Sequence, residues 1–103
     1  MIDIEETFNK YDDEFLEFDD VIDKVSNRRD LCAFILLDKL APSSKPSDII
    51  SASEHDEIFL DFDMEMLAKN ASEDDIITLT RCGIRFNSEF NCLCMYVCLI
   101  WKD

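Results

Sequence analysis

The chain has 103 residues, an apolar fraction of 48% and a formal net charge of −14, from 24 acidic and 10 basic side chains. This length allows one hydrophobic core, so we predict a single compact domain over residues 1–103, and the apolar fraction is too high for a disordered chain. The charge disfavours direct binding to nucleic acid or to an anionic membrane and favours a basic partner.

No apolar run approaches the roughly 20 residues that cross a bilayer, and the longest covers the ten residues 92–101. The first residues, MIDIEETF, lack the basic and apolar regions of a secretory signal. The five cysteines are an odd number and mostly lie among apolar residues, which is typical of reduced thiols rather than a disulfide framework. We therefore expect an intracellular protein.

Two segments contain nearly all of the excess acid. Residues 1–23 carry ten acids and one base, and residues 51–75 carry nine acids and one base. Stabilising pairs four residues apart would place bases among these acids, yet Lys10 is the only base before Lys24. A solvated surface is the general interpretation of a charge run, but a block of one sign is also typical of a binding face.

The first predicted element is an amphipathic helix over residues 8–25. Large apolar side chains recur at spacings of three and four residues, which places them on one stripe of a helix: Phe8, Tyr11, Phe15, Phe18, Ile22 and Val25. Most carboxylates then fall on the opposite side. Leu16 falls among them, so it is either an exposed apolar contact or a point where the helix bends. We predict a helix with an apolar back and an acidic front.

A second helix is predicted in RRDLCAFILLDKL, residues 28–40. Ser26 and Asn27 are suitable caps before it, and Pro42 ends it. Its apolar side consists of Leu31, Phe34, Ile35, Leu37 and Leu40, with Cys32 and Ala33 near the packing surface. Residues 41–48 then form a loop by composition, and we expect a short helical turn within DIISASEHDE.

A strand is predicted in EIFLDFD, residues 57–63, where aromatic and aliphatic residues are concentrated. Two short helices follow it, because Asp63 can cap the first and Ser72 with Asp75 can open the second. Gly83 is the single glycine of the chain, and it stands where a helix C-terminus favours a left-handed residue. The predicted helices therefore end at this glycine.

The last predicted element is an antiparallel hairpin, with strands at residues 84–86 and 92–101 around the turn NSEFN. Alternation leaves both faces of the final strand apolar, so helices or a second subunit must cover each face. We predict an α+β domain of four or five helices packed on a small antiparallel sheet of about three strands. If helices do not cover both faces of the final strand, a second subunit could cover one of them, which would make the protein a homodimer through the sheet.

Candidate metal sites in the sequence are weak. The thiols of Cys92, Cys94 and Cys98 would lie about 7 Å apart or more along a straight strand, which is too far for one zinc ion. DFDME begins like a calcium loop, but Met66 and Ser72 stand where that loop needs glycine and glutamate. We expect no metal and no cofactor.

Enzymatic motifs are also missing from the sequence. It contains no dinucleotide fingerprint, phosphate loop or nucleophile elbow, and we do not expect an enzyme. His55, the single histidine, lies among acids and is interpreted as a surface loop residue. Those acids favour its charged form, so a pH-sensitive role remains open.

The acidic runs YDDEFLEFDD and SEDD in a small chain resemble the bacteriophage inhibitors that mimic DNA against restriction enzymes and CRISPR effectors. RRDLCAFILLDKL, SASEHDEIFLDFD and TRCGIRF are similar to small proteins encoded in tailed-phage genomes. The resemblance implies a phage protein that acts in the cytoplasm of a bacterial host. It supplies no functional residues, because no motif of known role is included.

The leading functional hypothesis is an inhibitor that presents carboxylates to the basic cleft of a nucleic-acid-binding host protein. Helical neighbours lie about 5–6 Å apart, which is comparable with the spacing of phosphates along a nucleic acid. The predicted contact residues are Asp12, Asp13, Leu16, Glu17, Asp19, Asp20 and Asp23, with a second group of Asp56, Glu57, Asp61, Glu73, Asp74 and Asp75. The alternative is a structural or adaptor protein that acts through homodimerisation or apolar docking.

Overall fold

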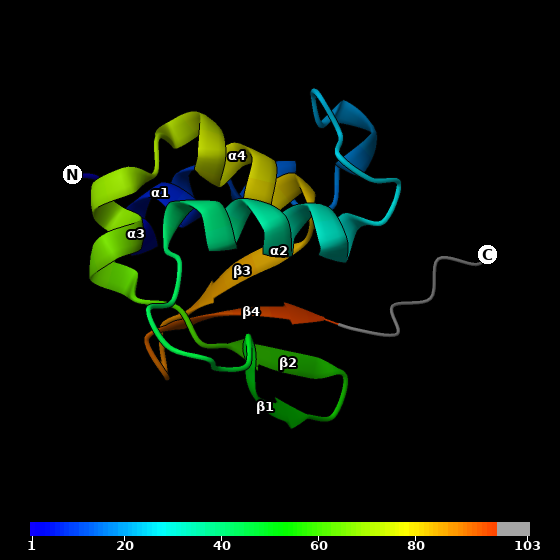
Figure 1. Ribbon diagram of the computed structural model, residues 1–103. Coiled ribbons are helices and arrows are strands. Elements are labelled where there is room, and N and C mark those ends of the chain that lie inside the picture. Colours follow the sequence, from blue (N-terminus) through cyan, green and yellow to red (C-terminus); the bar gives the residue numbers. More distant parts are fainter. Residues whose placement is uncertain (97–103) are drawn as a thin grey trace.

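The computed structural model describes residues 1–96, which form helices on one face of an antiparallel sheet (Figure 1). The structure thus confirms the predicted α+β fold class. Within those residues there are four α-helices, two short 3-10 turns and four strands. In chain order the helices and strands are α1 (Ile4–Lys10), α2 (Arg29–Leu40), β1 (Ile50–Glu54), β2 (Glu57–Leu60), α3 (Met64–Asn70), α4 (Glu73–Arg81), β3 (Ile84–Asn87) and β4 (Cys92–Tyr96).

The sheet has the strand order β1-β2-β4-β3, with every neighbouring pair antiparallel. It contains four strands rather than about three, because residues 50–54 form β1 instead of the predicted helical turn. His55 lies in the turn between β1 and β2 with a φ of 57°. The β1 strand forms by pairing with β2 along one edge, although its serines and alanine give little local preference for a strand.

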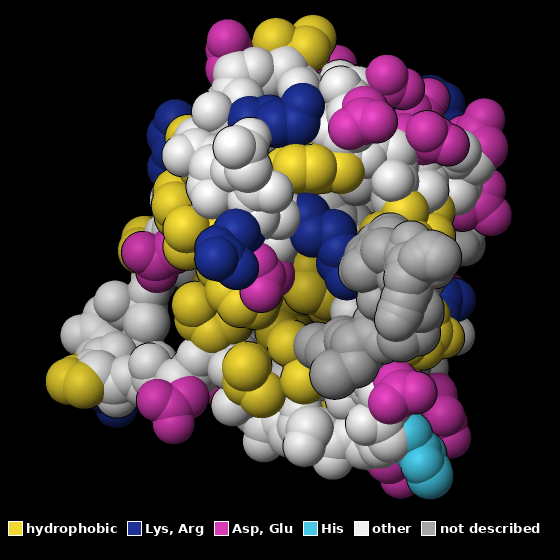
Figure 2. All heavy atoms as spheres, turned by 90° about the vertical axis from the view of Figure 1, so that its right-hand side faces the viewer, with side chains coloured by type: hydrophobic (Ala, Val, Ile, Leu, Met, Phe, Trp, Pro, Cys, Tyr) yellow, Lys and Arg dark blue, Asp and Glu magenta, His cyan; other side chains and the backbone are white. Residues whose placement is uncertain are grey.

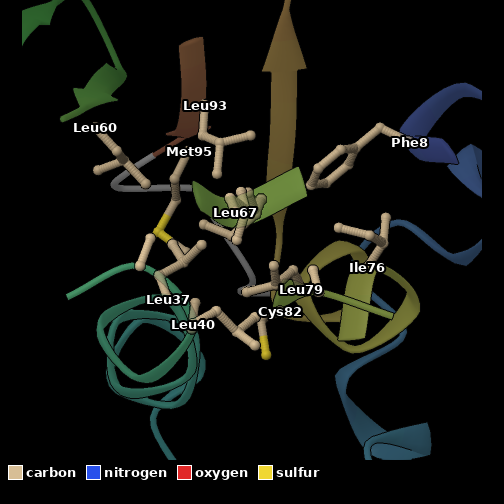
Figure 3. Close-up of a cluster of buried hydrophobic side chains, with 14 of the residues drawn as sticks. Phe8, Leu37, Leu40, Leu60, Leu67, Ile76, Leu79, Cys82, Leu93 and Met95 are labelled. Atoms are coloured by element: carbon tan, nitrogen blue, oxygen red, sulfur yellow. The ribbon is translucent and has the colours of Figure 1, made fainter. Parts of the chain in front are cut away.

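The core lies between the helices and the inner face of the sheet. Its central side chains come from all four helices and from strands β2 and β4 (Figure 3). Those with no exposed surface include Leu37, Leu67, Ile76, Leu79 and Leu93. The predicted strand at residues 92–101 is confirmed as far as Tyr96, and its remainder lies outside the described residues. Within residues 1–96 helices cover the face of β4 that carries Leu93 and Met95, and no helix covers its other face, so the apolar pattern predicted more helix cover than the structure shows.

The predicted helix over residues 8–25 is wrong beyond its first turn. The α1 helix ends at Lys10, and 3-10 turns at Asp12–Glu14 and Phe18–Asp20 follow it. Leu16 has a φ of 64°, which a helix cannot contain, and its N–H donates to the Thr80 carbonyl at 3.1 Å. Repulsion between carboxylates three or four residues apart disfavours the continuous helix, and these tertiary contacts replace its backbone hydrogen bonds.

The second predicted helix is confirmed as α2, and most of its predicted packing side is buried, including Leu37 and Leu40. Leu31 and Ile35 were expected in the core, and they are 44% and 45% exposed. Cys32 and Ala33 are buried, as predicted, and the helix packs from one side only, on α3, α4 and the sheet. Neither Ser26 nor Asn27 provides the N-cap, since the cap residue is Arg28 and makes no side-chain capping bond.

The caps predicted later in the chain are confirmed. Asp63 accepts hydrogen bonds from the first backbone N–H groups of α3. At the start of α4, Ser72 Oγ accepts from the Asp75 N–H at 3.1 Å, and Asp75 Oδ2 accepts from the Ser72 N–H at 2.9 Å. Gly83 follows α4 with a φ of 97°. These short helices therefore begin and end where local sequence signals place them.

Replacing Ser72 with alanine is expected to lower the free energy of unfolding by about 1 kcal/mol, because one of the two reciprocal capping bonds is lost. Urea denaturation followed by circular dichroism measures this change. Ser88→Ala is the matched control, since Ser88 is exposed and its side chain makes no hydrogen bond to residues 1–96. An equal loss for the two variants would contradict the capping role.

Candidate functional site

The connection between α1 and α2 contains most of the predicted contact residues, and we call residues 11–25 the acidic loop. Arg81 on α4 holds this loop at two points: its Nε donates to Glu14 Oε1 at 2.9 Å, and its Nη1 donates to the Asp20 carbonyl at 3.1 Å. The Leu16 N–H bond to Thr80 adds a third attachment to α4. The loop is therefore fixed in place although it has little regular structure.

Six carboxylates of the acidic loop are exposed and make no hydrogen bond or ion pair with the described part of the chain: Asp12, Asp13, Glu17, Asp19, Asp20 and Asp23. Glu14 is the exception, because it pairs with Arg81. Lys24 is the single base of the loop, and its ammonium lies 5.1 Å from the ring centroid of Phe18. The acidic members of the predicted first group thus share one loop, and the described residues place no base against their carboxylates.

Apolar side chains are also exposed on the acidic loop. Ile22 is 77% exposed and Val25 is 64% exposed, although both were predicted to face the core. Leu16, which was predicted to contact a partner, is half-buried and packs towards Gly83. The loop therefore combines carboxylates with apolar side chains, but the apolar members differ from the predicted one.

The second predicted group does not form one surface. Asp56 and Glu57 lie at the β1–β2 turn, and Asp61 lies past the other end of β2. In Figure 2 acidic side chains gather in the upper part of the face, where Figure 1 places the acidic loop, and separately around the histidine at the lower edge. The remaining three acids, residues 73–75, are at the start of α4.

Glu73 connects the start of α4 with the start of the acidic loop. Its carboxylate accepts a hydrogen bond from the Tyr11 hydroxyl and pairs with Lys10 Nζ at 3.4 Å. These two neighbours, first the Tyr11 hydroxyl and then Lys10, lower the pKa of Glu73. Asp75 is engaged in the capping box, so Asp74 is the one carboxylate of this run that makes no bond to residues 1–96.

The cysteines in the described residues are free thiols. Burial raises the pKa of Cys82 and of Cys94 to about 12, so both stay protonated at neutral pH. Cys98, the third member of the weak metal motif, lies outside the described residues. Across residues 1–96 no three His, Cys, Asp or Glu side chains are arranged to hold a metal ion.

Two adjoining hollows at the end of β2 were not predicted from the sequence. The first, the aspartate hollow, has a volume of about 290 Å³ and four carboxylates in its wall: Asp38, Asp48, Asp61 and Asp63. The second, the phenylalanine hollow, has a volume of about 440 Å³ and is lined by Phe59, Phe62 and Phe90. Only Asp61 was a predicted contact residue, because the others come from separate segments and form no run.

No protein-family model matches this chain, and neither a curated protein nor a solved structure matches it. The resemblance to phage inhibitors therefore stays a prediction. None of the helices within residues 1–96 has the length and apolarity to cross a bilayer, and the longest, α2, has 12 residues.

Proposed function

We propose that this protein is a non-enzymatic inhibitor that binds the basic nucleic-acid-binding surface of a host defence protein, such as a restriction or CRISPR effector, in the bacterial cytoplasm. The supporting observation is the acidic loop, where six unpaired carboxylates and two exposed aliphatic side chains share one fixed segment. The carboxylates occupy the place of phosphates in the basic cleft.

Electrostatics favours such a complex. Exposed charges interact over about 8 Å at physiological salt, so adjacent carboxylates of one sign add to a common field near the loop. A cleft lined with Lys and Arg attracts that field and speeds association. The Arg81 bonds already hold the loop against α4, so less conformational entropy is lost on binding than for a free segment.

The exposed aliphatic side chains favour a protein partner over simple solvation. A loop that serves only solubility has no need to expose Ile22 and Val25 between its acids. Protein interfaces combine charged residues at the rim with apolar contacts near the centre. A basic cleft with an apolar wall therefore matches this loop better than a uniformly basic surface.

Competition with DNA tests the proposal directly. Purified restriction and CRISPR effectors are each loaded with a fluorescent duplex, and the protein is added while anisotropy is recorded. We expect the protein to displace the duplex from at least one effector, and displacement to weaken at high salt. The triple variant Asp13→Lys, Glu17→Lys and Asp20→Lys should lose displacement by at least about 100-fold, because three attractive contacts become repulsive.

The matched control reverses three exposed acids away from the acidic loop: Glu54, Glu65 and Glu89. It changes the net charge by the same amount and should retain displacement within about threefold. Circular dichroism checks that both variants are folded. Equal loss in the two variants would show a net-charge effect rather than a loop-specific site, and retained displacement by the loop variant would refute the proposal.

A second candidate function is docking through apolar surface, as in an adaptor or a homodimer. The observation that favours it is the exposure of Leu31 and Ile35 on neighbouring turns of α2. Apolar association strengthens or persists at high salt, whereas a charge-based complex dissociates. Sedimentation at low and high ionic strength distinguishes the two, since a dimer that persists in high salt supports the docking function.

A further inference from the structure

The phenylalanine hollow lies where two connections meet at one end of the sheet. The β2–α3 connection and the β3–β4 turn both leave the sheet at its left end in Figure 1. The hollow is open to solvent, and its apolar wall is formed by Ala52, Phe59, Phe62, Met64, Phe90 and Cys92. Its volume of about 440 Å³ is sufficient for a large side chain and its neighbours.

The aromatic rings of the hollow are held in fixed positions. Leu60 and Leu93 point to the core (Figure 3), so alternation places Phe59 on the opposite, helix-free face of the sheet. Phe90 meets it edge-to-face, with ring centroids 5.5 Å apart and an interplanar angle of 78°. The Phe90 N–H donates to Asn87 Oδ1 at 3.0 Å, which fixes the turn, and Phe90 as a whole is 58% exposed.

Negative charge borders these rings. Asp61 and Phe62 line both the phenylalanine hollow and the aspartate hollow, so the two spaces adjoin. Asp61 is exposed, and its carboxylate makes no hydrogen bond or ion pair within residues 1–96. Asp38 and Asp48 add two further exposed carboxylates next to it. The hollow therefore offers aromatic faces together with an unpaired anion at its rim.

We infer that the phenylalanine hollow binds an arginine side chain of a partner protein. The aliphatic stem and guanidinium plane of arginine pack on aromatic rings, and the guanidinium donates to a carboxylate in a planar, bidentate pair. The exposed ring of Phe90 provides the aromatic face, Phe59, which is only 9% exposed, supports that ring from behind, and Asp61 provides the carboxylate. An aliphatic residue next to the arginine would contact Met64 and Ala52 on the same wall.

This site is separate from the proposed inhibitory surface. The β2–α3 connection and the β3–β4 turn, which contribute residues to the hollow, lie at the opposite end of the molecule from the acidic loop (Figure 1). It is also different in kind, because it recognises one side chain through aromatic contact rather than a charged surface through many carboxylates. The inference therefore does not depend on the proposed function.

Peptide titration followed by NMR tests the inference. The probes are a capped Leu-Arg-Leu peptide and its citrulline counterpart, which keeps the shape of arginine and removes its charge. We expect the arginine peptide to saturate shifts of Asp61, Phe62 and Phe90 at millimolar concentration. The citrulline peptide should bind about fivefold more weakly or worse, because the cation–π and ion-pair contacts are lost.

Two variants and one control locate the site. Asp61→Asn and Phe90→Ala should each weaken binding of the arginine peptide about fivefold or more, because each removes one class of contact. Glu89→Gln makes the same charge change in the adjacent turn without lining the hollow and should leave binding unchanged. Equal binding of the two peptides, shifts centred on the acidic loop, or the absence of saturation would each overturn the inference.

Discussion

Replacing Leu79 with alanine is expected to lower the free energy of unfolding by about 3 kcal/mol, the largest loss that we predict for a single substitution. Leu79 has no exposed surface and packs from α4 into the centre of the core (Figure 3). Truncation removes buried methyl groups and leaves a cavity that the surrounding side chains fill only in part. Urea denaturation followed by circular dichroism measures the difference.

The loss of unfolding free energy in Leu79→Ala is best compared with that in Ile22→Ala. The apolar spacing of the sequence places Ile22 on a core-facing stripe, which would make its truncation comparably costly. The structure leaves Ile22 77% exposed, so we expect a change of less than about 0.5 kcal/mol. A loss for Ile22→Ala close to that for Leu79→Ala would favour the continuous helix and contradict the acidic loop.

Gly83→Ala is expected to lower the free energy of unfolding by about 2–3 kcal/mol. The φ of 97° lies in a region that L residues avoid, at a cost of about 1–2 kcal/mol. A β-carbon there would also lie 2.5 Å from Arg29 Nη1 and 3.0 Å from Leu16 Cδ2. Arg29 would have to move, although its Nη1 donates to the Cys82 carbonyl and its Nη2 to the Tyr96 carbonyl.

A double-mutant cycle separates the two causes of this loss. In an Arg29→Met background the guanidinium is removed, so Gly83→Ala should cost only the backbone strain of about 1–2 kcal/mol. The same denaturation measurement applies to all four proteins. A cost that is identical in both backgrounds would exclude crowding by Arg29, and no cost in either background would contradict the left-handed conformation.

The position of the acidic loop is linked to the same region of the fold. Leu16 packs towards Gly83, and its backbone is bonded to Thr80 at the end of α4. Arg81, in the last turn of that helix, holds both 3-10 turns of the loop. Changes at Gly83 should therefore disturb the loop as well as the core, and loop charge variants provide the cleaner test of function.

Elements with strong local signals could be predicted from the sequence. The capping box at Ser72 and Asp75, the cap at Asp63 and the left-handed Gly83 each depend on contacts within about four residues of chain. The hairpin of β3 and β4 could be predicted for a similar reason, since its turn residues and apolar runs are adjacent in sequence.

Elements with a weak local signal, or with parts that are distant in the chain, could not be predicted. The β1 strand has little strand preference of its own, and it is defined by its pairing with β2. The aspartate hollow assembles carboxylates from α2, the loop after it and the β2–α3 connection, so no run in the sequence marks it. Phe90 lies in a predicted turn, and only the fold brings its ring against Phe59.

The sequence by itself determined the α+β class, the sign of the charge and the segments in which acids concentrate. The tertiary structure decided the conformation of the acidic loop and which side chains it exposes. The physical reason is the range of the contacts: helix periodicity reflects neighbours three and four residues apart, whereas the Glu14–Arg81 pair spans 67 residues. That distant pair, with the Leu16 bond to Thr80, fixes a non-helical loop whose carboxylates face solvent beside Ile22 and Val25.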